Sequence, residues 1–371
     1  MKIGVTGSDG LLGFHIRAFL HASKDSRQIR LANRATFQDA GALDEFVSGL
    51  DALIHCAGMN RGGDAEVERV NCWLAETLIA SLERTGAKPR IVFANSTHFD
   101  RDTGYGRGKR KAGEQLVAWG GRMGVSVSNV ILPHIFGEFG RPFYNSVVST
   151  FCHQLANGET PCIHVDGGLE LVHAQEVAEL FMQLIRSQAE GEGRIHRIAG
   201  QPLKVSELLE LLNEFRDKYE HGIIPAFRDV FQVRLFNVLR SYKFPQAYPR
   251  RLALHSDARG SLFEAVKSEG GGQTFLSSTG QGITRGNHFH LRKVERFLVI
   301  DGEGEIRLRR LFSNDVISFR VTGRAPSYVD IPNFYTHSIT NVGDGNLQTL
   351  FWTNEIFNPA DSDTFPEIVL P

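Results

Sequence analysis

The sequence predicts an α/β domain with a doubly wound parallel sheet, followed by a smaller domain made of β-strands alone. From residue 1 to about 200, strand-like and helical patterns alternate across short connections. After about residue 250 the helical period disappears, and short strand-like runs are separated by Gly, Asn and Asp. At 371 residues the chain is also too long for one ordinary domain. We therefore expect a first domain over residues 1–250 and a second over 251–371.

In the first part, β-rich apolar runs are predicted to form the sheet and amphipathic stretches to cover it. The predicted strands are Ile3–Thr6, Ile29–Ala32, Ala52–Cys56, Ile91–Asn95 and Ser126–Leu132. The predicted helices are Leu11–Ala22, Glu66–Thr85, Lys109–Trp119 and Val205–Tyr219. An irregular segment with prolines at 225, 245 and 249 is expected to follow, up to about residue 250.

In the second part, strand-like runs recur at short intervals between turn residues. The clearest are Gln273–Ser277, Arg296–Ile300, Gly304–Arg310 and Leu347–Trp352. Many short strands at such spacing predict a β-sandwich or a barrel.

Composition and charge exclude several classes of protein. Hydrophobic residues make up 42% of the chain, which is ample for a globular core. Lysine and arginine total 41 against 42 acids, and this balance argues against binding to nucleic acid. No signal peptide and no apolar run of about 18–20 residues is present, so we expect a cytoplasmic protein without a membrane partner. The four cysteines lack C-x-x-C spacing and are expected to be reduced.

A glycine-rich loop follows the first predicted strand. Gly7, Gly10 and Gly13 form G-x-x-G-x-x-G at the start of a helix that continues with Leu11 and Leu12. Such glycines let a pyrophosphate approach the backbone, and the helix N-terminus offers free N–H groups to it. The loop therefore predicts a dinucleotide site, although a structural turn is the alternative.

Arg34 lies just after the second predicted strand, where NAD-binding folds commonly carry an acid for the ribose hydroxyls. A guanidinium there can pair with a 2′-phosphate, which favours NADPH over NADH. The alternative is a solvated surface arginine.

Tyr105 and Lys109 are four residues apart and so are neighbours on one helical face. A nearby ammonium lowers the pKa of a phenol toward the operating pH, which suits proton transfer. Ser96 and Thr97 follow the Ile91–Asn95 strand, and either hydroxyl could orient a carbonyl oxygen. We prefer Ser96 as the catalytic hydroxyl because of its spacing to Tyr105.

These motifs resemble the extended short-chain dehydrogenase/reductase family over roughly residues 1–245. The resemblance includes Asn71 and the segment Leu132–Gly137, which in that family follows the strand beside the nicotinamide. It implies a Rossmann-type fold, a catalytic set of Ser96, Tyr105 and Lys109, and a homodimer. The cofactor contacts that it implies, together with the residues above, are Cys56, Ala57, Gly58, Tyr105, Lys109 and Pro133. Gly108 departs from the family, which usually has serine there.

The second part carries a candidate metal site. His288 and His290 point to one face of a strand, and Glu295 and His337 can complete a mixed nitrogen and oxygen set. The pattern resembles the cupin family, whose first motif G-x5-H-x-H-x4-E-x6-G matches from Gly282 to Gly302. The second motif is less complete, since Phe334 replaces a usual glycine. Zinc is our first choice of metal, but Fe, Mn or Ni would also suit these ligands, and a metal-free barrel is the alternative.

Asp257–Glu264 and Thr284–His288 also resemble nucleotide-keto-sugar 3,5-epimerases, in which the histidine matching His288 acts as a base. With His290, Glu295 and His337 present, we expect His288 to be a ligand. Tyr335, Asp330 and Lys293 are candidates for the epimerisation base, chosen by proximity in sequence alone.

Joined in one chain, the two halves resemble a family of bifunctional capsular polysaccharide enzymes in UDP-N-acetyl-L-fucosamine synthesis. The resemblance implies C3-epimerisation of a UDP-2-acetamido-2,6-dideoxy-4-keto-hexose by the cupin. NADPH-dependent reduction at C4 would then give UDP-2-acetamido-2,6-dideoxy-L-talose. Arg141 and Asn145 are candidate contacts of the sugar nucleotide, or caps of a local turn.

Two other functions are compatible with these motifs. The second domain could be a metal-stabilised structural or dimerising module beside a reductase with a single activity. The whole chain could instead be a redox-sensing regulator with degenerate sites, although the intact Tyr105–Lys109 pair and the complete first cupin motif argue against this.

Overall fold

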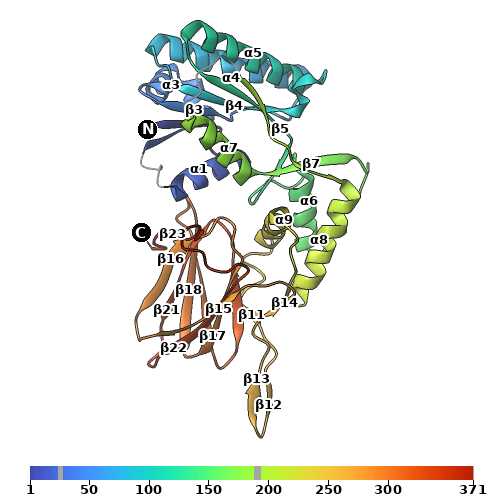
Figure 1. The fold of residues 1–371 in the computed structure, drawn as a ribbon, viewed down its shortest axis with the longest axis vertical. Coiled ribbons are helices and arrows are strands. Elements are labelled where there is room, and N and C mark those ends of the chain that lie inside the picture. The colour runs from blue at the N-terminus through green and yellow to red at the C-terminus, as the bar shows by residue number, and fades with distance from the viewer. Residues whose placement is uncertain (24–27, 188–193, 371) are drawn as a thin grey trace. The chain divides into compact units, whose positions relative to one another are not determined.

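The computed structural model describes residues 1–23, 28–187 and 194–370 (Figure 1). It divides into two compact units, Met1–Val147 with Asp166–Val205, and Val148–Val165 with Ser206–Pro371. Among the described residues, no helix combines the length and the apolar character needed to cross a bilayer.

The first unit is built on a six-stranded parallel sheet in the order β2-β1-β3-β4-β5-β8. Its strands confirm the predicted ones to within a residue at each end and add β8. They are β1 Ile3–Thr6, β2 Ile29–Ala32, β3 Ala52–His55, β4 Arg90–Ser96, β5 Val127–Leu132 and β8 Arg194–Arg197. A separate three-stranded sheet contains β6 His134–Phe136, β7 Gly168–His173 and β9 Gln201–Lys204. Because β1 pairs with both β2 and β3, the strand order reverses at β1, where such sheets bind ligands.

Helices cover both faces of the parallel sheet (Figure 1). Alternate strand residues point to opposite faces. Leu53 and Phe93 therefore enter one core with α3, α4 and α5, while Ile54 and Val92 enter another with α1 and α7. The helices of this unit are α1 Leu11–Ala22, α2 Arg34–Gln38, α3 Ala40–Val47, α4 Asp64–Thr85, α5 Gly104–Met123 and α7 Ala174–Arg186, with a 3-10 turn at Thr97–Asp100.

Helix α5 begins at Gly104, five residues before the predicted start at Lys109. The glycines at 104, 106 and 108 lower helix propensity, and this hid the first turn from the sequence pattern. The Thr103 side chain caps the helix by accepting from the Gly106 amide at 3.1 Å. A Cβ on Gly104 would lie 1.9 Å from the Asp64 carbonyl oxygen, and one on Gly108 would lie 3.0 Å from Asn71 Cβ, so these two glycines permit close packing on α4.

The second unit contains two five-stranded antiparallel sheets, in the orders β11-β20-β17-β22-β15 and β19-β18-β21-β16-β23. Their facing apolar residues form one core, which is consistent with the predicted cupin-like barrel. Short pairs β10–β14 and β12–β13 lie outside these sheets. The strands are β10 Ile223–Ile224, β11 Arg250–Arg251, β12 His255–Asp257, β13 Gly260–Leu262, β14 Lys267–Ser268, β15 Gln273–Thr279, β16 Thr284–Phe289, β17 Glu295–Asp301, β18 Glu303–Arg310, β19 Val316–Thr322, β20 Ser327–Ile331, β21 Tyr335–Asn341, β22 Leu347–Thr353 and β23 Phe365–Pro366.

Helices that precede residue 250 pack with these strands. They are most of α6 Val147–Ala156, α8 Val205–Glu220 and α9 Val230–Ser241. The expectation of an irregular segment before residue 250 was wrong for α9, which the Asp229 side chain caps by accepting from the Gln232 amide at 2.9 Å. Tyr219 donates to Asp330 at 2.7 Å and Arg240 donates to the Ile331 carbonyl at 3.0 Å. These buried contacts tie both helices to the β-strands, so the compact units divide near residue 205, whereas the domain boundary at 250 stays a prediction.

Replacing Gly104 with alanine is expected to destabilise the first unit by about 1–3 kcal/mol, because the new methyl overlaps the Asp64 backbone. In the same helix, a Cβ on Gly121 meets nothing within 4 Å. Gly121→Ala is the matched control and should stabilise by about 0.5–1 kcal/mol.

Thermal unfolding can be followed by tryptophan fluorescence in a Trp352→Phe background. The chain has 3 tryptophans, and the other two, Trp73 and Trp119, both lie in the first unit. Equal melting temperatures for the two alanine variants would contradict close α4–α5 packing.

Candidate active site and metal centre

The glycine loop lies at the point where the strand order reverses. Gly7 has a φ of 66°, and a Cβ there would lie 2.8 Å from the Ala57 amide nitrogen. A Cβ on Gly13 would lie 2.1 Å from the Gly7 carbonyl oxygen. Gly10 is the N-cap of α1 without a side-chain cap, so the first N–H groups of the helix face outward for an anion. This geometry fits the pyrophosphate of a dinucleotide.

Arg34 is exposed and is the first residue of α2, directly after the carboxyl end of β2. Within the described ranges its guanidinium has no carboxylate partner. Pro133 directly follows β5, and Cys56, Ala57 and Gly58 directly follow β3. All the predicted cofactor residues of this group therefore lie at or just beyond the carboxyl edge of the sheet.

Lys109 is buried, and its ammonium donates to the Ala94 carbonyl at 2.7 Å. Its Nζ also lies 4.8 Å from the centre of the Phe93 ring. Burial lowers the pKa of Lys109 to about 8. For Tyr105, burial raises the pKa of the phenol, and a hydrogen bond with Ser96 opposes that change.

Ser96 and Tyr105 are thus in contact, and no contact between Thr97 and Tyr105 is recorded in the described part of the chain. Ser96 also accepts from the His98 amide at 3.2 Å, which fixes the turn that follows β4. Ser96 at the end of β4 therefore meets Tyr105 on α5, and Lys109 lies one turn further along the same helix.

Asn71 holds the loop after β3 beside Lys109. Its amide donates to the Met59 carbonyl at 2.6 Å and accepts from the Met59 N–H at 3.2 Å. A Cβ on Gly58 would lie 3.4 Å from Lys109 Nζ, so the backbone at Gly58 lies close to the ammonium. Gly108, which replaces the usual serine, faces α4, since its Cβ would lie 3.0 Å from Asn71 Cβ.

Sequence reasoning missed His98 as a neighbour of Tyr105. The centres of the two rings are 6.2 Å apart, and the centre of the His134 ring lies 5.8 Å from that of His98. Its position two residues after Ser96 was the available signal.

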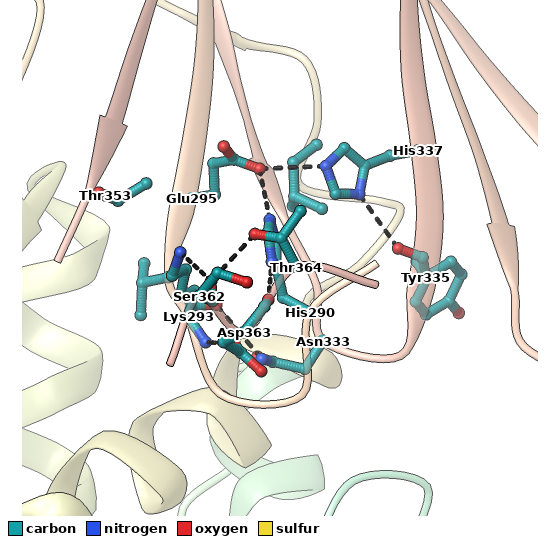
Figure 2. Close-up of polar contacts among 12 residues, drawn as sticks. His290, Lys293, Glu295, Asn333, Tyr335, His337, Thr353, Ser362, Asp363 and Thr364 are labelled. Atoms are coloured by element: carbon teal, nitrogen blue, oxygen red, sulfur yellow. Dashed lines mark hydrogen bonds and ion pairs between the residues drawn. The ribbon is translucent and has the colours of Figure 1, made fainter. Parts of the chain in front are cut away.

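The predicted metal ligands His288, His290, Glu295 and His337 form one group, with ligand atoms all within 4.8 Å of one another. They come from β16, β17 and β21 and the residue just beyond β16. Figure 2 shows His290 and His337 both directed at the Glu295 carboxylate. Each Nε2 lies 3.0 Å from the same oxygen, Glu295 Oε2.

In the neutral form of these two histidines, the contacts of the outer nitrogen, Nδ1, indicate which ring nitrogen carries the proton. His290 Nδ1 donates to the Asp363 carbonyl, and His337 Nδ1 donates to the Tyr335 carbonyl at 3.1 Å. A carbonyl only accepts, so each neutral ring keeps a lone pair on the Nε2 that faces Glu295. Two lone pairs and a carboxylate oxygen at this distance repel unless a proton or a metal ion lies among them. The donor set therefore fits a divalent metal, with the backbone carbonyls orienting the ligands.

The pKa directions describe the group without a metal. Burial alone would lower the pKa of His290, but Glu295 and Asp363 raise it, so without a metal this ring tends to hold a proton toward Glu295. Burial would raise the pKa of Glu295, but His290 and His337 outweigh it and hold the pKa well below its usual range. Burial, with His337 and His290 nearby, lowers the pKa of His288 to about 3. A neutral His288 is the form that can bind a metal.

His288 and Glu295 open onto a cavity of about 480 Å³ in the second unit. The cavity is also lined by Phe275, Leu276, Ser277, Ser278, Arg285, Gly286, Phe297, Ile339 and Phe351. None of the three candidate bases is in this lining. Asp330 is buried in a pair with Arg296, Lys293 donates to the Ser362 carbonyl, and the Tyr335 ring packs on Phe244.

Phe334 adopts the backbone shape of the glycine that it replaces. Its φ is 64°, its side chain is fully buried, and its amide donates to the His290 carbonyl at 2.9 Å. A left-handed conformation costs a bulky residue about 1–3 kcal/mol. Burial of a phenylalanine side chain stabilises by about 1.5–3 kcal/mol, so packing offsets the strain. The loop beside the metal ligands is kept despite the departure from the motif.

A second buried group, His15, Glu138 and His173, was missed because its members are far apart in sequence. His15 Nδ1 accepts from the Gln175 amide at 3.0 Å, and His173 Nδ1 accepts from the Gln175 backbone N–H at 3.3 Å. Both Nε2–H groups therefore donate to Glu138, to its carbonyl and to its carboxylate, each at 3.1 Å. In this arrangement no imidazole lone pair faces the carboxylate, so the group is a hydrogen-bonded core network.

Two known families match separate parts of the chain. Residues 3–199 match the NAD dependent epimerase/dehydratase family, and residues 255–365 match the polysaccharide biosynthesis C-terminal domain. The chain belongs to the NAD dependent epimerase/dehydratase family.

The similarity to particular proteins covers almost the whole chain. A UDP-2-acetamido-2,6-beta-L-arabino-hexul-4-ose reductase of Pseudomonas aeruginosa is 29% identical over 367 residues, which is 98% of each chain. The capsular polysaccharide assembling protein CapF of Staphylococcus aureus is 28% identical, with a TM-score of 0.62 over 99% of this chain and 100% of that one. These matches confirm the resemblance to bifunctional capsular polysaccharide enzymes predicted from the sequence. RMD of Pseudomonas aeruginosa, solved with NADPH, shares the fold at 20% identity, with a TM-score of 0.52 over 58% of this chain and 85% of that one.

His290→Ala and His337→Ala are each expected to abolish binding of a divalent metal, because each removes a converging Nε2. Metal content after dialysis can be measured by inductively coupled plasma mass spectrometry. His255→Ala, at an exposed position of β12, is the control and should keep its metal. We expect about one ion per chain, since the His15 group offers no free lone pair; two ions per chain would contradict that distinction.

Proposed function

We propose that this protein is a bifunctional nucleotide-sugar enzyme of surface polysaccharide synthesis. Its second domain would epimerise C3 of a UDP-2-acetamido-2,6-dideoxy-4-keto-hexose. Its first domain would then reduce C4 with NADPH, giving UDP-2-acetamido-2,6-dideoxy-L-talose. The observation that carries the proposal is that one chain holds Ser96, Tyr105 and Lys109 in its first unit and a converging His/Glu set in its second. Its similarity to full-length relatives supports the proposal.

In the reductase reaction, bound NADPH supplies the hydride. Tyr105 donates a proton to the C4 oxygen, and Ser96 orients that oxygen by a hydrogen bond. Burial makes the Tyr105 phenol a weaker acid, and the hydrogen bond with Ser96 opposes that change. Lys109, one helical turn away, would stabilise the phenolate further by its charge. Lys109 is held for this role by the Ala94 carbonyl.

Arg34 supports the choice of NADPH. It is an exposed guanidinium just beyond β2, where the adenosine ribose lies in folds of this kind. It has no carboxylate partner within the described residues, which leaves it available to a 2′-phosphate.

In the epimerase reaction, a C4 ketone acidifies the hydrogen on C3. His288, His290, Glu295 and His337 would hold a divalent ion, with zinc our first choice, and this ion supplies Lewis acidity toward a ketone oxygen. Arg285 lines the same cavity and adds positive charge where an enolate oxygen or a phosphate would lie. Reduction at C4 removes the ketone and its acidifying effect, so epimerisation has to come first.

One observation favours a second candidate, a reductase with a single activity and a structural metal-binding domain. None of the three bases suggested by sequence lines the cavity that His288 and Glu295 open onto. A domain that only holds a metal needs no such base.

The two candidates differ in an exchange experiment. The protein is incubated in deuterated water with UDP-linked 4-keto-6-deoxy-N-acetylhexosamine, without NADPH, and C3 is followed by NMR. We expect deuterium at C3, and no exchange with His288→Ala or His290→Ala. Tyr105→Phe should lower NADPH oxidation by about 10²–10⁴-fold and leave the exchange intact. Exchange absent in the wild type, with NADPH oxidation present, would leave the single-activity reductase.

The same assay tests the cofactor. We expect NADPH to support a higher kcat/KM than NADH, and Arg34→Ala to narrow the difference. An unchanged preference in Arg34→Ala would remove the assignment of the 2′-phosphate site, while the exchange result would stand.

A further inference from the structure

Two loops of the first unit are joined by polar contacts beside the candidate active site. One follows β3 and carries Asn60 and Arg61, and the other follows β6 and carries Arg141 to Asn145. Tyr144 donates from its hydroxyl to Asn60 Oδ1 at 2.7 Å. Arg61 donates from Nε to Asn145 Oδ1 at 3.2 Å and from a terminal nitrogen to the Phe143 carbonyl at 3.0 Å.

The Tyr144 ring lies close to two guanidinium groups. The Cζ of Arg61 is 5.1 Å from the ring centre, and the Cζ of Arg141 is 5.2 Å from it. Both arginines are exposed, and in the described part of the chain neither has a carboxylate within ion-pair distance. The acceptors of Arg61 named above are neutral oxygens. The two positive charges therefore lie close together with no carboxylate to neutralise them. Such a pair of planar donors is suited to a phosphate or diphosphate.

The location of this pair limits which anion it meets. Arg61 is three residues beyond Gly58, and a Cβ on Gly58 would lie 3.4 Å from Lys109 Nζ. Three extended residues span at most about 10 Å, so the backbone of Arg61 lies no further than that from Gly58. One sugar ring and its diphosphate can bridge such a distance from the reduction centre. In a hexose, C4 and C1 are at opposite sides of the ring, and C1 bears the diphosphate. The cofactor's own phosphates have separate positions, at the N-terminus of α1 and at Arg34.

We propose that Arg61 and Arg141 form the binding site for the diphosphate of the nucleotide-sugar substrate. Tyr144 and Asn145 are positioning residues, since the Asn145 oxygen already accepts from Arg61 and the Tyr144 ring lies against both cations. The substrate class rests on the proposed function, whereas the diphosphate chemistry rests on the paired charges alone.

The test is isothermal titration of the full-length protein, saturated with NADP⁺, with UDP and with uridine. Arg61→Gln and Arg141→Gln are each expected to raise the Kd for UDP by about 10-fold, because each removes one charge-assisted hydrogen-bonding group. Affinity for uridine, which has no phosphate, should not change. Arg61→Lys keeps the positive charge without the planar guanidinium, so it should raise the Kd for UDP by less than Arg61→Gln does.

Arg122→Gln is the matched control, an exposed arginine of α5 paired with Glu83 instead of an aromatic ring. It should bind UDP as the wild type does. The affinity of the protein for NADPH, titrated separately, should be equal in all these variants.

Two outcomes would overturn the proposed diphosphate site, and a third would overturn only the proposed function. Unchanged UDP affinity in the Arg61→Gln, Arg141→Gln double variant would mean that the pair does not bind the diphosphate. An equal loss for NADPH and UDP would make the pair part of the cofactor site. Weakened UDP binding in a protein that does not reduce the 4-keto sugar would overturn the proposed function and retain the site, so the two failures are distinguishable.

Discussion

A single buried cation, the Lys109 ammonium, constrains the arrangement of the whole first unit. A charge taken out of water needs acceptors and close neighbours, and here the Ala94 carbonyl and the Phe93 ring supply them from β4. To bring Lys109 so deep, α5 must pack closely on α4, which its glycines at 104 and 108 allow. The backbone at Gly58 passes close to the ammonium, and Asn71, whose Oδ1 would lie 3.0 Å from a Cβ on Gly58, holds that loop in place. The position of this candidate catalytic lysine, the packing of the helices and the shape of the loop therefore depend on one another.

The two buried His/Glu groups show that composition alone does not define a metal site. Both contain histidines and a glutamate within ligand distance of one another. What separates them is the atom beyond each ring. When the rings are neutral, the carbonyls behind His290 and His337 leave lone pairs facing inward, whereas the N–H donors behind His15 and His173 leave protons facing inward. The first arrangement favours a cation, and the second satisfies its own carboxylate.

Much of this could be predicted from the sequence, for identifiable reasons. The strands of the parallel sheet are short apolar runs, and the candidate metal ligands follow a fixed spacing on paired strands. The α9 helix was missed because prolines on both sides suggested irregular chain, although Asp229 offers a capping signal. His98 beside Tyr105, Arg61 beside Tyr144 and the His15 group depend on contacts between distant segments, and single-sequence periodicity carries no information about those. The same limit applies to the suggested bases. Asp330 and Lys293 are close to the candidate ligands in sequence, but they do not line the cavity.

Phe334 has a consequence for how relatives of this chain are recognised. The motif that names glycine at its position describes a backbone conformation, and here a buried aromatic residue adopts that conformation and is held by packing. A sequence motif that requires glycine at this position rejects such a chain, whereas a criterion based on the backbone dihedral angles accepts it. Family members whose second motif looks degraded can therefore retain an intact loop, and the histidine three residues later is the better criterion for keeping them.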